Sequence, residues 1–432
     1  MTRKQLVAFG MLGFAKDLLL SFSGGLLMLY LTDSLTIATA LAGGILSFNR
    51  LFDIFNDFIS AYLLDKFSNH LKRWYLLGMI ASLIIFVTLF SLTVFLPKSL
   101  IIFAVFILYF ILEISFSLMD VSYWSLLPRL STSEDMRQKL STVATFFSSF
   151  AALICFTSAM PLLHLFGGEH GFTGLTIVIA VLVAVIVLFT YPHLPDPKPG
   201  PSEKKISLSL KEIYQLILQN HLFLSYILYF FFFQLSFEWM NSYNIYYFKY
   251  SINQDYFFSI YAFTILAQLF GASLYPRLAK LISKQLIFYL SACLSILGML
   301  ALFIVGQTLS DNSLLMFFAA SIKQIGSGLF MVTATHDLAL VIDISSQKTG
   351  KYYPAILTSA KLLVAKLSTS LTALGIGFGL HFAGYVNNQR QTPHTALLIS
   401  LQTFGIPIIF VVISLIGYHF YRQMVQHEKR TS

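Results

Sequence analysis

The apolar stretch FNRLFDIFNDF, residues 48–58, contains polar side chains that are able to bind an ion. Arg50, Asp53 and Asp57 follow the i, i+3, i+7 spacing that aligns side chains on one face of a helix. Asn56 lies at the edge of that face. Sodium and other hard cations bind carboxylate, amide and hydroxyl oxygens, whereas two neighbouring buried carboxylates can instead hold a proton. We therefore expect a monovalent cation site, and the sequence leaves the choice between Na+ and H+ open.

Ionised side chains are costly in such an apolar segment. At the centre of a bilayer each costs about 2.5 to 3.5 kcal/mol on insertion scales, so Arg50, Asp53 and Asp57 together represent on the order of 8 to 10 kcal/mol. A purely structural alternative is an internal ion pair, in which Arg50 neutralises one aspartate and joins two helices. That alternative leaves the second carboxylate and Asn56 without a role. We therefore favour a cation site that Arg50 holds together while it is empty.

Polar faces of the same kind occur in other apolar stretches. Residues 112–128, LEISFSLMDVSYWSLLP, place an acid, a hydroxyl, a second acid and an indole at spacings of four, three and four; these are Glu113, Ser117, Asp120 and Trp124. Further polar residues within apolar runs are Lys16, Asp17, Gln234, Glu238, Asn241, Asn244, Lys361 and Lys366. Because they come from both halves of the chain, we expect them to line a shared cavity for a polar ligand. For any single residue the alternative is a hydrogen bond between helices.

The composition places these polar faces in a membrane protein. Of the 432 residues, 57% are hydrophobic and only 11% are charged, and the mean hydropathy is +0.76. A spanning helix needs roughly 20 apolar residues, and about twelve such runs follow one another between short polar breaks. We therefore expect an all-α integral membrane protein with twelve transmembrane helices in two six-helix bundles.

The expected helices form two groups of six. In the first half they lie near 6–31, 39–64, 74–96, 100–127, 139–164 and 173–192, and in the second half near 222–247, 256–275, 286–306, 314–342, 355–384 and 396–420. The segment between the groups is rich in proline and charge, which is typical of a linker, and it ends in an expected short amphipathic helix. The predicted domains are an N-terminal bundle, residues 1–192, a cytoplasmic linker, residues 193–221, and a C-terminal bundle, residues 222–432.

Lysine and arginine residues indicate the orientation. They gather in every second connection, and the alternate loops hold only Lys98, Lys249 and Arg390. Short loops rich in these residues stay cytoplasmic, so both termini are expected in the cytoplasm. The net charge of +9 therefore reflects topology and does not indicate nucleic-acid binding. The expected partners are the lipid bilayer, a small-molecule substrate and a monovalent cation, and the protein is expected to be a monomer.

No catalytic constellation accompanies this pattern. His336 and Asp337 are adjacent in the sequence HDLAL, but they lie in the expected helix 314–342 with no nucleophile near them in sequence. A histidine in the core or on a cavity wall is the better interpretation. We expect no enzymatic activity and no bound cofactor.

Several of these motifs resemble a known transporter family. RLFDIFNDFISAYLLDKFSNHLKRW, MDVSYWSLLP and the FAKD of the first expected helix are similar to signatures of the melibiose permease family, and so is AKLSTSLTALGIGFGLHFAGYV in the second half. That family comprises the glycoside–pentoside–hexuronide:cation symporters of the major facilitator superfamily. The resemblance covers nearly the whole chain. It implies two six-helix bundles that rock about a binding site at the middle of the membrane.

The resemblance also implies roles for individual residues. The residues implied to bind the coupling cation are Asp53, Asn56, Asp57 and Ser117, the last where the family usually has threonine. The residues implied to face the sugar are Lys16, Asp17, Asp120 and Trp124. Lys366 matches a lysine that links the substrate and cation sites across the two halves, so it is expected both to belong to the substrate site and to share the charge pairing with Arg50. From their polar helical face, Glu238 and Asn241 are further candidates for the substrate site.

Two positions depart from the family pattern. Phe58 stands where the family usually has proline, and Thr145 stands where sugar-transporting members have an arginine in the substrate site. The implied function is cation-coupled symport of a sugar, a glycoside or another small polar solute by alternating access, in the bacterial inner membrane. A lysolipid or other amphiphile is the alternative substrate. A membrane sensor that binds its ligand without moving it is the alternative function.

Overall fold

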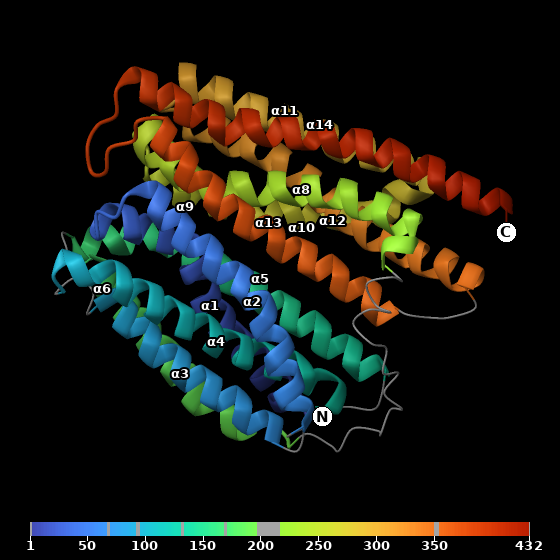
Figure 1. The fold of residues 1–432 in the computed structure, drawn as a ribbon, viewed down its shortest axis with the longest axis horizontal. Coiled ribbons are helices and arrows are strands. Elements are labelled where there is room, and N and C mark those ends of the chain that lie inside the picture. The colour runs from blue at the N-terminus through green and yellow to red at the C-terminus, as the bar shows by residue number, and fades with distance from the viewer. Residues whose placement is uncertain are drawn as a thin grey trace. The chain divides into compact units, whose positions relative to one another are not determined.

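In the computed structural model, every regular element of the described residues is helical. The described residues are 2–66, 70–91, 96–130, 134–167, 171–196, 217–349 and 354–431. The elements of the first half are α1 (Arg3–Leu29), η1 (Tyr30–Ser34), α2 (Thr39–Lys66), α3 (Leu71–Ser91), α4 (Lys98–Leu130), α5 (Glu134–Phe166), α6 (Gly171–Thr190) and η5 (Tyr191–His193). Those of the second half are α8 (His221–Tyr246), η6 (Tyr247–Ser251), α9 (Tyr256–Ala262), α10 (Ile265–Leu281), α11 (Lys284–Thr308), α12 (Ser313–Thr349), α13 (Pro354–Phe382) and α14 (Pro393–Thr431) (Figure 1).

Eleven membrane-spanning candidates occur among the described residues, each long and apolar enough to cross a bilayer. A helix suits this setting because it satisfies its own backbone hydrogen bonds, which hydrocarbon cannot do. The long helix α2 falls outside this set, because the polar residues of the stretch 48–58 lower its hydropathy. The all-helical architecture is as predicted, whereas length and hydropathy alone give eleven spans instead of twelve.

The chain divides into two compact units, Met1–Lys204 and Lys205–Ser432. In the first unit, α1 packs against α5, and α4 packs against α2 and α3. In the second unit, α8 packs against α13 and α14, and α12 packs against α10 and α11. The point of division falls within the expected linker, of which residues 197–216 lie outside the described residues, together with most of the expected amphipathic helix.

Aromatic side chains fill the interior of each unit. In the first unit, Phe22 of α1 packs edge-on against Phe90 of α3, with ring centroids 5.0 Å apart. In the second unit, Tyr418 of α14 stacks on Phe288 of α11 at 3.7 Å and packs edge-on against Tyr229 of α8 at 5.1 Å. Aromatic pairs contribute about 0.5 to 1.5 kcal/mol beyond the burial of their area. They therefore help to fix the helices that carry the polar residues.

The first long helix of each unit ends in the same way. α1 continues into the π-helical turn η1, and α8 continues into the π-helical turn η6. In each turn the backbone N–H five residues beyond the first tyrosine donates to the carbonyl of that tyrosine at 3.1 Å. A residue with positive φ then follows, Thr36 at 54° and Asn253 at 55°. YLTDSLT and YFKYSIN therefore form a structural repeat between the two halves of the chain.

Several helices extend beyond the apolar runs that predicted them. α5 begins at Glu134, α12 reaches Thr349 and α14 reaches Thr431, each several residues beyond the predicted end. Lysine, arginine, glutamate and glutamine favour helix, so the polar flanks continue the helices past the apolar stretch. The expected helix 256–275 consists instead of α9 and α10, which are separated by a turn at residues 263–264.

Candidate functional site

Lys16 on α1 lies between two carboxylates. Its Nζ is 2.5 Å from Asp17 Oδ1 and 2.7 Å from Asp120 Oδ1 of α4. The lysine side chain is 2% exposed, whereas those of Asp17 and Asp120 are 14% and 38% exposed. Charge-assisted contacts of this kind are the strong ones. The buried ammonium therefore fixes two acids that are still accessible to hydrogen-bond donors.

Two aromatic rings cover the same ammonium. Lys16 Nζ lies 5.2 Å from the centre of the Tyr123 ring and 5.6 Å from that of Trp124, which is 42% exposed. The Tyr123 hydroxyl donates to the Phe9 carbonyl at 3.1 Å, and it approaches Gly13 so closely that a Cβ there would collide with it. The structure thus brings together the residues predicted to face the substrate in the first unit, Lys16, Asp17, Asp120 and Trp124.

The expected cation site joins α2 to α4. Ser117 Oγ donates a hydrogen bond of 2.5 Å to Asp53 Oδ1. Asn56, three residues beyond Asp53, is 6% exposed, and its buried Nδ2 has no hydrogen-bond partner. Because the two ends of an amide exchange by a flip, this position can equally present an oxygen. Asp57 lies one turn from Asp53 on α2 and is half-buried, so the four predicted cation ligands lie on two packed helices.

Arg50 has neighbours that the sequence analysis did not assign to it. Its Nη2 donates to the Gly24 carbonyl of α1 at 3.1 Å. Tyr109 of α4 lies close to the side chains of both Arg50 and Glu113. The arginine therefore connects α2 to both α1 and α4. Glu113, predicted only as a member of a polar face, belongs to this Arg50 group.

The second unit contains a polar cluster on α8, α9 and α12. Gln234 Nε2 donates to Glu238 Oε1 at 2.9 Å. Further along α8, Asn241 Oδ1 accepts from the Tyr261 hydroxyl at 3.4 Å and from Lys323 Nζ at 3.5 Å. The sequence analysis named Glu238 and Asn241 but missed Lys323. A lysine within an apolar run itself indicates a functional position. Lys323 was missed because the prediction relied on helical faces that carry several polar residues.

Two lysines lie on α13 of the same unit. Lys366 is half-buried. Lys361 places its Nζ 5.0 Å from the centre of the Phe230 ring on α8. The link between Lys366 and the cation site of the first unit stays a prediction.

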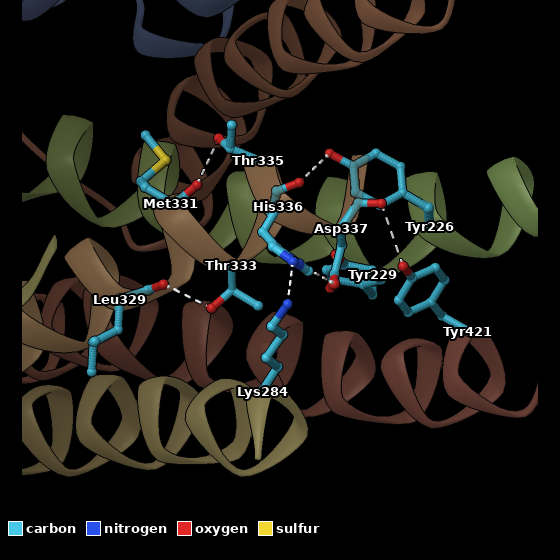
Figure 2. Close-up of polar contacts among 11 residues, drawn as sticks. Tyr226, Tyr229, Lys284, Leu329, Met331, Thr333, Thr335, His336, Asp337 and Tyr421 are labelled. Atoms are coloured by element: carbon cyan, nitrogen blue, oxygen red, sulfur yellow. Dashed lines mark hydrogen bonds and ion pairs between the residues drawn. The ribbon is translucent and has the colours of Figure 1, made fainter. Parts of the chain in front are cut away.

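Asp337 on α12 is a buried acid that lies among polar side chains of three neighbouring helices. The Tyr229 hydroxyl donates to its Oδ2 at 2.9 Å, and the Tyr421 hydroxyl donates to its backbone carbonyl at 3.4 Å. His336 Nδ1 lies 3.6 Å from Asp337 Oδ1. Figure 2 shows this network, in which Lys284 of α11 points at His336. It ties α12 to α8, α11 and α14.

Comparison with known proteins decides the family. A family described as "MFS/sugar transport protein" matches residues 6–423, almost the whole chain. The chain belongs to the MFS/sugar transport protein family. This membership confirms the resemblance to melibiose permease-like symporters that the motifs predicted. The MFS/sugar transport family and the relatives in it are transporters, so the protein is a transporter and not an enzyme.

Two relatives illustrate this MFS/sugar transport membership. The isoprimeverose transporter of Lactiplantibacillus pentosus is 24% identical over 425 residues, which are 96% of this chain and 88% of that protein. The lactose permease of Lactobacillus delbrueckii subsp. bulgaricus is 23% identical over 320 residues, which are 71% of this chain and 50% of that protein. The chain thus spans about half the length of that permease.

A solved structure shares the fold. The crystal structure of a bacterial homologue of the human lysosomal transporter Spinster matches with a TM-score of 0.73 and 11% identity, covering 100% of this chain and 98% of its own. At that identity the likeness shows the fold alone. The protein therefore has an all-helical transporter fold of the major facilitator type.

Proposed function

We propose that the protein is a secondary active transporter that couples a monovalent cation, Na+ or H+, to the symport of a sugar, a glycoside or a similar small polar solute. The hydrogen bond of 2.5 Å between Ser117 and Asp53 carries the proposal, because it joins two oxygen ligands from α2 and α4 within an apolar bundle. Asn56 and Asp57 add an amide and a second carboxylate on α2. Such an oxygen-rich set suits a hard cation, and its paired acids suit a proton.

The substrate half of the proposal rests on the Lys16 cluster. Asp17 and Asp120 can accept hydrogen bonds from sugar hydroxyls, and the exposed Trp124 ring offers an apolar face for a sugar ring. The names of the relatives, an isoprimeverose transporter and a lactose permease, support a sugar as the solute. Binding a cation cancels charge before the loaded site crosses the membrane. One positive charge moving across about 100 mV releases roughly 2.3 kcal/mol, enough for roughly fifty-fold accumulation of a neutral solute.

We include α2 as the twelfth span. Its polar residues Asn49 and Asn56 are buried at 0% and 6% exposure, whereas Phe55 and Ile59 are 61% and 56% exposed. Burying amides while exposing large apolar side chains suits a helix whose outer face lies in lipid. The proposal places the two bundles at residues 1–192 and 222–432, both termini in the cytoplasm, and the protein as a monomer in a bacterial inner membrane.

Uptake into proteoliposomes tests the proposed function. The purified protein is given an inward sodium gradient or an inward proton gradient, with labelled lactose or isoprimeverose outside. We expect one gradient to drive accumulation of at least one sugar, and an ionophore that collapses that gradient to abolish it. Binding without uptake under either gradient would favour a membrane sensor. Uptake of a lysolipid but of neither sugar would favour an amphiphile transporter.

A further inference from the structure

Lys323 is a buried lysine that the proposed cation and substrate sites of the first unit do not use. It lies on α12 and is 1% exposed. Gly298 of α11 lies directly against the backbone of Lys323. A Cβ at Gly298 would collide with the backbone nitrogen of Lys323. This close approach of α11 and α12 fixes the place of the lysine within the second unit.

The ammonium of Lys323 has only weak polar partners. Its Nζ donates to Asn241 Oδ1 at 3.5 Å and to Gln324 Oε1 at 3.4 Å, which are long hydrogen bonds. It also lies 4.7 Å from the centre of the Phe237 ring. Within the ranges that the structure describes, no carboxylate lies at ion-pairing distance from Lys323. Glu238 acts on it at longer range.

Lys16 of the first unit shows the opposite arrangement. It is similarly buried, but two carboxylates lie within 2.7 Å of its ammonium. A buried ammonium whose only hydrogen-bond partners are two long amide contacts costs several kcal/mol. Lys323 is therefore suited to an anion that comes from outside the chain.

The groups around Lys323 can complete such a site. Asn241 and Gln324 each carry an amide NH2 donor besides the oxygen that faces the lysine. The Tyr261 hydroxyl reaches Asn241 at 3.4 Å. Asn244, 0% exposed, lies beside that hydroxyl, but neither of its amide atoms completes a hydrogen bond. The amide NH2 groups of Asn241 and Gln324 therefore lie near the ammonium, and Asn244 adds unpartnered amide atoms beside Tyr261.

These residues form what we call the Lys323 cluster, which consists of Asn241, Tyr261, Lys323 and Gln324. Asn241 is half-buried and is the most exposed member of the cluster, and its Oδ1 contacts the Lys323 ammonium. Glu238, also half-buried, opposes an anion, but one of its oxygens is engaged by a hydrogen bond of 2.9 Å that Gln234 donates. Rotation of the Asn241 amide would exchange its oxygen for an NH2 donor beside the ammonium.

We propose that the Lys323 cluster is a carboxylate-binding subsite, in which Lys323 selects acidic over neutral sugars. A single ammonium matches the one charge of a carboxylate better than the two charges of a phosphate ester. The amide donors of Asn241 and Gln324 then serve the second carboxylate oxygen. This inference rests on the proposed function, because it names the class of sugar that the transporter carries.

A matched pair of probes tests the subsite. Methyl β-D-glucuronide and methyl β-D-glucoside differ only by a carboxylate in place of a hydroxymethyl group, and their binding to the purified full chain is measured by calorimetry. We expect the glucuronide to bind at least about tenfold more tightly. Lys323→Gln removes this preference and changes glucoside affinity less than about threefold. Lys249→Gln, a matched loss of charge in η6 beside the Tyr250 ring, keeps the preference.

A second variant covers the case in which Lys323→Gln does not fold. Asn241→Asp supplies an internal carboxylate to Lys323, so it is expected to raise the melting temperature and to abolish the preference for the glucuronide. Three results would overturn the assignment: no binding of the glucuronide, equal affinity for both probes, or preference retained in Asn241→Asp. Coupling is measured separately, by uptake into proteoliposomes under a cation gradient. If the glucuronide binds in a way that depends on Lys323 but no cation gradient drives its uptake, the proposed symport is contradicted and the subsite is kept.

Discussion

Ser117 on α4 donates a hydrogen bond of 2.5 Å to Asp53 on α2. Three residues further along α4, Asp120 pairs with Lys16 of α1 at 2.7 Å. One turn of α4 therefore carries a residue of the proposed cation site and a residue of the proposed substrate cluster. A cation that changes the charge at Asp53 changes the electrostatic setting of Asp120 over a short distance in a medium of low dielectric constant. This adjacency gives cation and substrate a direct physical route for coupling.

Replacing Ser117 with alanine tests the hydroxyl ligand. Ser117→Ala removes a hydrogen bond to a charged partner, so we expect the affinity for the coupling cation to fall about tenfold while the fold is kept. The affinity for the coupling cation is measured from the rise in melting temperature as the cation concentration is increased. Ser122→Ala is the matched control, because the Ser122 hydroxyl donates to the Leu118 carbonyl within the same helix at 2.6 Å. If both variants lose affinity equally, Ser117 is not a cation ligand.

Asp57 is expected to bind the coupling cation directly. Asp57→Asn removes one negative charge but keeps the shape, so it should abolish the stimulation of substrate affinity by the cation and leave weak, uncoupled binding. Substrate affinity with and without sodium, and across pH, is the measurement. Asp311→Asn, a change in an exposed loop carboxylate, should behave like the unmodified protein. Full cation stimulation in Asp57→Asn would place the site elsewhere.

Asp120 is expected to serve the substrate more than the cation. Asp120→Asn leaves Lys16 with Asp17 as its remaining acid partner and removes a charged acceptor, so substrate affinity should fall by about tenfold or more. Cation binding should largely survive. Asp196→Asn is the control, because that side chain is 92% exposed and pairs only at 3.4 Å with Lys72. Equal loss of cation and substrate binding would assign Asp120 to the cation site or to the fold.

Hydropathy predicted the all-helical fold because lipid imposes long apolar runs on every span. Hydropathy did not predict the features that helix propensity or local turns determine. The ends of α5, α12 and α14 lie beyond the apolar runs, since polar flanks with good helix propensity continue the helix. α2 is missing from the eleven span candidates because its polar face lowers the mean hydropathy by which a span is recognised. Turns such as that at residues 263–264 leave no clear mark within an apolar sequence.

The candidate sites divide in a similar way. Lys16, Asp17, Asp120 and Trp124 were predictable, because helical spacing and a family motif indicated them. Contacts between helices that are distant in sequence were not. The proximity of Tyr109 to Arg50 and Glu113 depends on which helices pack together and in what register. The same is true of the amides near Lys323. Neither the helical spacing nor the hydropathy of the sequence indicates which helices pack together.

The buried acid Asp337 is expected to depend on Tyr229. Tyr229→Phe removes the hydroxyl that donates to Asp337 Oδ2 at 2.9 Å and keeps the ring that packs in the core. We expect a loss of about 1 to 3 kcal/mol in the free energy of unfolding, because a buried carboxylate loses a donor. The apparent melting temperature in detergent reports it. Tyr256→Phe, at a residue that is 58% exposed, should leave that temperature unchanged, and equal effects would contradict this role for Tyr229.

Gly298 is expected to be required by the close packing of α11 against α12. A Cβ at this position would lie too close to the backbone nitrogen and Cβ of Lys323, and backbone cannot move aside as a flexible side chain can. Gly298→Ala should therefore destabilise the protein by about 1 to 3 kcal/mol through overpacking. Gly405→Ala in α14 is the control, because a Cβ there meets nothing within 4 Å. Alanine favours helix over glycine, so the control should be neutral or slightly stabilising. Melting temperatures of the two variants in the same detergent decide the matter: if Gly298→Ala melts at or above the temperature of Gly405→Ala, the two helices are not held as closely as the structure has them.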